Sequence, residues 1–117
     1  MMVQPPHNTA FDSALRLIIT EATEQTGILT LVRMGDDPGR DRMSLLIKAV
    51  QIAFEGLRGE RQIERLLAAS LFNLAFHIQS QLSAKQPSSS WPPELLGSEK
   101  IDLYLAVESI FEDHQIW

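Results

Sequence analysis

The 117-residue sequence contains no cysteine. Disulfide bridges, thiolate zinc sites, iron–sulfur clusters and cysteine nucleophiles are therefore excluded. Long apolar runs are also absent: clean stretches such as residues 66–69 fall far short of the roughly 18 residues that a membrane-spanning helix requires. The N-terminus has no basic segment followed by an apolar one, as a secretory signal would. We therefore expect a soluble cytoplasmic protein that does not associate with membranes.

Catalytic and cofactor-binding motifs are lacking as well. There is no glycine-rich phosphate loop, no nucleophile elbow, no pair of histidines one helical turn apart and no Glu-x-x-His pair. The three histidines, His7, His77 and His114, have no spacing typical of a metal site. We expect a protein that is not an enzyme and that binds no cofactor or metal.

The charge is unevenly distributed along the chain. The 10 basic and 15 acidic residues give a net charge of −5, which argues against nucleic-acid binding because that affinity comes largely from phosphate neutralisation. Within residues 94–117, Lys100 is the single base. The acids there are Glu94, Glu99, Asp102, Glu108, Glu112 and Asp113. The whole imbalance therefore belongs to the last quarter of the chain.

The hydrophobic periodicity predicts an all-α, single-domain bundle of four main amphipathic helices over residues 9–117. The expected helices cover about 9–26 with a bent continuation to 34, 40–57, 60–84 and 98–115. Residues 28–33 are rich in β-branched side chains, but no second segment could pair with a strand there, so we favour a helix. Residues 1–8, with Pro5 and Pro6, are expected to form a mobile arm.

The third expected helix has more apolar surface than one packing seam needs. One broad stripe runs along Ile63, Leu67, Leu71, Leu74, Ala75, Ile78 and Leu82. Phe72 and Phe76 point well away from that stripe, near Ala69. We expect Ala69, Phe72 and Phe76 to form a homodimer interface. The alternative is that another part of the chain, with Trp91 or Trp117, covers this face.

The last helix carries an acidic strip. Glu108 and Glu112 share a side away from its apolar arc, which consists of Leu103, Tyr104, Val107, Ile110 and Phe111. With Asp113 and the terminal Trp117, these glutamates are interpreted as a docking strip for a basic protein partner. A solvated face that keeps the protein soluble explains the same charges.

A polar group on the third helix supports a different hypothesis. Ser70, Asn73 and His77 lie together at helical spacing and could form the polar end of a small-molecule pocket. A solvated flank or a satisfied hydrogen-bond network explains them equally simply. The favoured function is a protein–protein interaction or regulatory module that self-associates and binds a basic partner. The alternative is a small-molecule-binding helical bundle.

Overall fold

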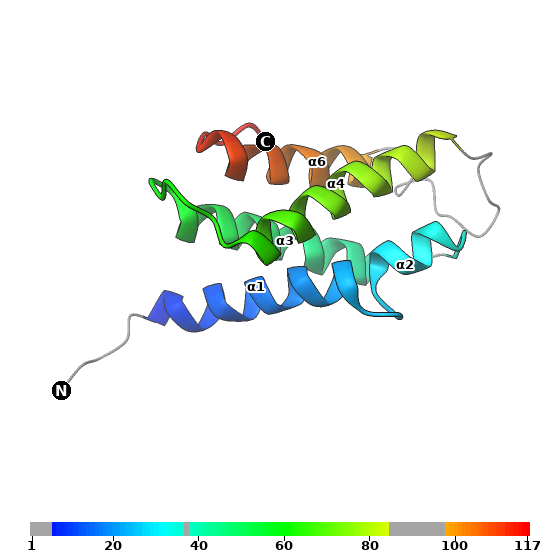
Figure 1. Cartoon of the computed structure of the whole chain (residues 1–117), viewed down its shortest axis with the longest axis horizontal. Helices are drawn as coiled ribbons and strands as arrows, with labels where there is room; N and C mark the ends of the chain where they lie inside the picture. Colours follow the sequence, from blue (N-terminus) through cyan, green and yellow to red (C-terminus); the bar gives the residue numbers. More distant parts are fainter. Residues whose placement is uncertain (1–5, 37, 85–97) are drawn as a thin grey trace.

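The computed structural model describes residues 6–36, 38–84 and 98–117. Its helices are α1 (Pro6–Thr23), α2 (Ile28–Arg33), α3 (Arg40–Leu57), α4 (Arg65–Ala84) and α6 (Ser98–Glu112) (Figure 1). No strand occurs in these residues. The expected all-α helical bundle is therefore confirmed.

The four long helices pack around one core. Helix α1 contacts α3 and α4, and α6 contacts the same two helices. Short α2 packs against α1 and α4 (Figure 1). The α1–α3 surface and the α4–α6 surface therefore lie on different sides of the bundle.

The core consists of apolar residues at helical spacing, among them Leu67, Leu71, Leu74, Ala75 and Ile78 of the predicted α4 stripe. All the helices contribute to it, including α2, whose Ile28, Leu29 and Val32 are buried. The residues 28–33 that could have formed a strand are helical, as expected. The other buried apolar residues are Ala14, Ile18, Met43, Leu46, Ala49, Val50, Ala53, Phe54, Leu103, Ala106, Val107 and Ile110.

The helix boundaries agree best for α3, which has the predicted bounds of 40 and 57. Helix α1 begins at Pro6, inside the segment expected to be a mobile arm, since proline fits the first turn of a helix. Residues 1–5 of that arm lie outside the described part. Helix α4 begins at residue 65 rather than 60, because residues 60–64 form the link from α3. Helix α6 ends at Glu112 rather than 115.

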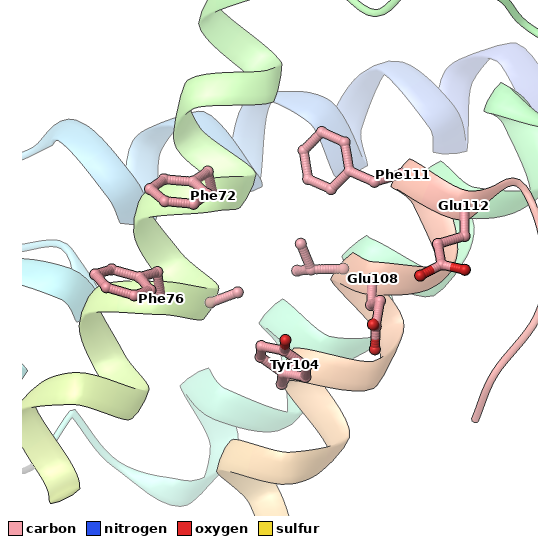
Figure 2. A pocket seen from close by; sticks show the side chains of 8 residues that line it. Phe72, Phe76, Tyr104, Glu108, Phe111 and Glu112 are labelled. Carbon is pink, nitrogen blue, oxygen red and sulfur yellow. The ribbon is translucent and has the colours of Figure 1, made fainter.

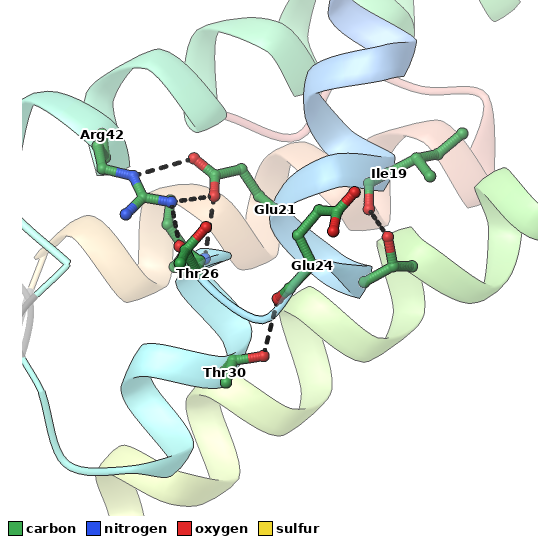
Figure 3. A network of polar contacts seen from close by, with 8 residues as sticks. Ile19, Glu21, Glu24, Thr26, Thr30 and Arg42 are labelled. Carbon is green, nitrogen blue, oxygen red and sulfur yellow. Dashed lines mark hydrogen bonds and ion pairs between the residues drawn. The ribbon is translucent and has the colours of Figure 1, made fainter.

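A partly buried ion pair holds the corner between α1 and α2 (Figure 3). Glu21 is only 5% exposed, and its carboxylate accepts hydrogen bonds from the backbone N–H of Ile28 and from the guanidinium of Arg42 on α3. Arg42 also donates to the carbonyl of Thr26 at 2.8 Å. A Cβ atom at Gly27 would lie 2.5 Å from the carbonyl oxygen of Glu21, so only glycine fits this turn. The corner is thus joined to α3 through Arg42, which donates both to the Glu21 carboxylate and to the Thr26 carbonyl.

A left-handed residue ends α6. Asp113 has a φ of 53°, and the N–H of His114 bonds to the carbonyl of Ser109, as in a Schellman motif. The Asp113 carboxylate accepts the N–H of Gly59 at 3.0 and 3.2 Å. The end of α6 is therefore fastened to the link between α3 and α4.

Candidate functional site

An apolar groove lies between α4 and α6 (Figure 2). Its volume is about 190 Å³. Helix α4 contributes Phe72, Ala75 and Phe76, and α6 contributes Tyr104, Val107, Glu108, Phe111 and Glu112. The groove therefore brings together the side chains expected to mediate self-association and the glutamates expected to bind a basic partner. We call it the α4–α6 groove.

Two stacked rings form the α4 wall. Phe72 and Phe76 are one turn apart, and their ring centroids lie 5.3 Å apart with an interplanar angle of 9°. Their exposed fractions are 54% and 50%, whereas Leu71 and Leu74 on the same helix are fully buried. Helix α4 thus has one apolar face in the core and a second that reaches the surface.

The α6 wall differs from the sequence-based expectation. Leu103, Val107 and Ile110 of the predicted apolar arc are buried, but Tyr104 and Phe111 are 40% and 47% exposed. Both rings lie along the groove, across from the phenylalanines of α4 (Figure 2). The five residues share one arc of α6, but this arc is wider than the surface that α3 and α4 cover. Tyr104 and Phe111, at the uncovered edge of the arc, therefore form the groove wall.

The charge of the groove is negative. Glu108 and Glu112 stand one turn apart on the α6 side (Figure 2), and no basic residue occurs among the described residues that line the groove. The C-terminal end of α6 adds the negative end of its helix dipole at the same place. An occupant that brings cations would therefore be attracted to this edge.

Asp113 and Trp117, expected to extend the acidic strip, do not line the groove. The Asp113 carboxylate is bonded to Gly59, and the Trp117 ring packs edge-on against buried Phe54, with centroids 5.0 Å apart. Ile116 donates its N–H to the Ser109 hydroxyl, which in turn donates to the carbonyl of Leu105. The segment after α6 is thus held against the bundle by its own contacts.

The remaining predicted residues lie elsewhere on α4. Ala69 is exposed but is not part of the groove. Ser70 is buried, and its hydroxyl donates to the carbonyl of Leu66 at 2.8 Å. Asn73 and His77 are half-buried, and the His77 ring meets Phe76 edge-on at 5.4 Å. The polar notch expected at Ser70, Asn73 and His77 does not line the groove either.

The Glu21–Arg42 pair and the exposure of Tyr104 and Phe111 in the α6 wall were not predicted from the sequence. One signal for the first was available: Glu21 follows Ile18 by three residues and therefore falls on the apolar face of α1. A charged residue on such a face needs a partner. The α6 wall could not be found this way, since it depends on which part of the arc α4 leaves uncovered.

Comparisons with known proteins give no identity: no protein-family model, curated protein or solved structure matches this chain. Among the described residues, no group of three or more His, Asp or Glu side chains could hold a metal ion. No helix in the same part of the chain is long and apolar enough to cross a bilayer.

Proposed function

We propose that this protein is a protein–protein interaction module that receives the apolar side chains of a basic partner in the α4–α6 groove. One observation carries the proposal: Phe72 and Phe76 are half-exposed and face Tyr104 and Phe111 across an open groove. Exposed aromatic residues gathered in one concave patch are typical of sites where proteins bind. Glu108 and Glu112 on the rim favour a basic partner.

The exposed rings of the groove supply part of the binding free energy. An aromatic side chain buries roughly 150–250 Å² when fully enclosed, so four half-exposed rings leave on the order of 400 Å² to be covered. At about 25 cal/mol per Å², this burial contributes about 10 kcal/mol before the cost of association. Because that cost is itself about 4–15 kcal/mol, the partner must add its own buried surface or charge contacts.

Self-association is a second candidate, favoured by the exposed positions of Ala69, Phe72 and Phe76 along one side of α4. A dimer through this surface would show a concentration-dependent sedimentation coefficient. The small-molecule alternative has less support, because the Ser70 hydroxyl already donates to Leu66 and none of the three notch residues lines the groove.

A selection from a displayed random-peptide library tests the proposal. The double variant Phe72→Ser with Phe76→Ser removes both rings of the α4 wall. The control is Ile101→Ser, which removes an equally exposed apolar side chain of α6 outside the groove. We expect peptides that bind the wild type and Ile101→Ser but lose binding to the double variant. A selection that yields no such peptides, from a protein that also sediments as a strict monomer, contradicts the proposed function.

A further inference from the structure

We infer that the partner segment is an amphipathic α-helix that carries two Lys or Arg residues one turn apart beside an apolar stripe. This inference rests on the proposed function and specifies the shape and charge of what the α4–α6 groove binds. Three properties of the groove lead to it: its hydrogen-bonding capacity, its length, and the spacing of its two carboxylates.

The hydrogen-bonding capacity of the groove favours a helix. Its described lining residues all belong to α4 and α6, whose interior backbone N–H groups are bonded within each helix. The Tyr104 hydroxyl is the only neutral side-chain donor among them. An extended strand binds by pairing its backbone with the edge of a sheet, and α4 and α6 offer no such edge to it. A helix satisfies its own backbone and offers only side chains.

The length of the groove sets the size of the helix. Its α6 wall runs from Tyr104 to Glu112, which corresponds to about 12 Å at 1.5 Å per residue. About two turns of a bound helix fit this distance. Two or three apolar side chains at i, i+3 or i+4, and i+7 would then lie between the α4 rings and the α6 rings.

The two carboxylates define the charged edge. Glu108 and Glu112 are i and i+4 neighbours, so their Cβ atoms lie roughly 5–6 Å apart along α6. Cations with the same i, i+4 spacing on a helix lying alongside α6 would face both carboxylates at once. Lysine and arginine also have long apolar stems that can cross the rings before the charge reaches the rim.

The same charges argue against a second copy of this chain as the occupant. If two copies met groove to groove, Glu108 and Glu112 of both would enter one interface, and no base occurs among the described lining residues to offset them. Like charges placed together across an interface oppose association. A partner with its own cations avoids this repulsion.

The test uses three fluorescent synthetic peptides of about 14 residues, close to the length at which an isolated helix becomes marginally stable. The first is amphipathic, with leucines on one face and lysines at i, i+4. The second has glutamate at each lysine position, and the third has the first composition in a scrambled order. Binding to the full chain is measured by fluorescence anisotropy at low and at physiological salt, with circular dichroism to follow helix formation.

We expect the amphipathic lysine peptide to bind and to gain helicity, while the other two bind at least about tenfold more weakly. Glu108→Gln with Glu112→Gln should weaken binding of the lysine peptide about tenfold or more and flatten its salt dependence. The matched control is Asp102→Asn, which removes an exposed carboxylate of α6 outside the groove and should change neither quantity.

Three outcomes overturn the inference. Equal binding of the scrambled peptide, or equal weakening by Asp102→Asn, shows that charge alone drives association. Groove-dependent binding of extended, neutral or acidic library peptides overturns the helical basic partner but leaves the proposed function standing. Failure of the lysine peptide together with a dimer that Phe72→Ser and Phe76→Ser dissociate assigns the groove to a second copy.

Discussion

At the scale of single residues, the Glu21 carboxylate connects α1 with the start of α2 and with α3. It accepts the Ile28 N–H at the start of α2 and the Arg42 guanidinium from α3, while Arg42 reaches the Thr26 carbonyl. Glu21 is almost completely buried and the Arg42 side chain is 38% exposed. Removing the cation therefore leaves a buried carboxylate that keeps the Ile28 N–H but loses its counter-charge, whereas removing the carboxylate leaves an arginine that can turn to water.

This asymmetry predicts the order of two substitutions. Arg42→Ala should lower the free energy of unfolding by about 3 kcal/mol, since it strands a buried charge. Glu21→Gln keeps an oxygen that can accept the Ile28 N–H and should cost about 1–2 kcal/mol. Urea unfolding at neutral pH measures both, with exposed Glu24→Gln as the matched control. An equal effect of Glu24→Gln, or no effect of Arg42→Ala, contradicts this role.

A close contact between α1 and α3 determines how a substitution at Gly56 should change stability. Gly56 lies inside α3, and a Cβ atom there would collide with the ring of Phe11 on α1. Alanine is the better helix former, so Gly56→Ala alone has opposing effects on stability. We expect a net loss of about 1–3 kcal/mol, because the ring must move out of its packed position.

The double variant isolates the contact. In a Phe11→Ala background the collision disappears, and Gly56→Ala should become stabilising by up to about 1 kcal/mol. A double-mutant cycle of thermal or urea unfolding gives the coupling energy between the two positions. A coupling energy near zero would show that α1 and α3 do not approach each other here.

At the scale of secondary-structure elements, the end of α6 depends on one residue in an unusual conformation. Asp113 occupies the left-handed position that glycine usually takes, and its carboxylate bonds to the Gly59 N–H. Asparagine tolerates this conformation and keeps an acceptor oxygen, glycine keeps only the conformation, and alanine keeps neither.

We therefore predict that Asp113→Asn is the most stable of the three variants, Asp113→Gly is less stable, and Asp113→Ala is the least stable. The alanine variant should lose about 1–2 kcal/mol relative to the wild type. Thermal unfolding followed by circular dichroism provides the measurement. If alanine is as stable as asparagine, the contact between α6 and the α3–α4 link contributes nothing.

Helix α4 has two apolar faces with different expected contributions to stability. Leu71 is fully buried, so Leu71→Ala should cost about 3 kcal/mol. Phe72→Ser and Phe76→Ser remove half-exposed rings and should each cost no more than about 1–2 kcal/mol, including their mutual stacking. Urea unfolding separates these cases, and a Phe72→Ser variant that fails to fold would show that the ring belongs to the core.

The elements also show how far the sequence predicts the fold. Helical periodicity was sufficient for α3 and for the buried stripe of α4, because both faces follow directly from residue spacing. It also indicated that Phe72 and Phe76 leave that stripe. It could not indicate that Tyr104 and Phe111 face them, since that depends on how α4 and α6 pack. Nor could spacing reveal that Asp113 and Trp117 have partners far away in sequence, Gly59 and Phe54.

At the scale of the whole molecule, helix packing brings together two groups of residues that the sequence assigned to different roles. The aromatic pair of α4 and the glutamates of α6 come from segments that lie far apart along the chain, yet they line the same groove. The four helices bury their main apolar faces in one core, and this second apolar surface stays exposed on one side of the bundle. We propose that this surface, rather than the α1–α3 side, receives the partner.

The most direct test is NMR mapping of the lysine-rich amphipathic peptide on the protein. We predict that the largest shifts occur in the ring and side-chain resonances of Phe72, Phe76, Tyr104, Phe111 and Glu108. The buried ring of Phe54 and the exposed Leu45 on α3 should change little. Shifts centred on Leu45 and the α1–α3 side, or no specific shifts at saturating peptide, would contradict the assignment of the α4–α6 groove as the binding site.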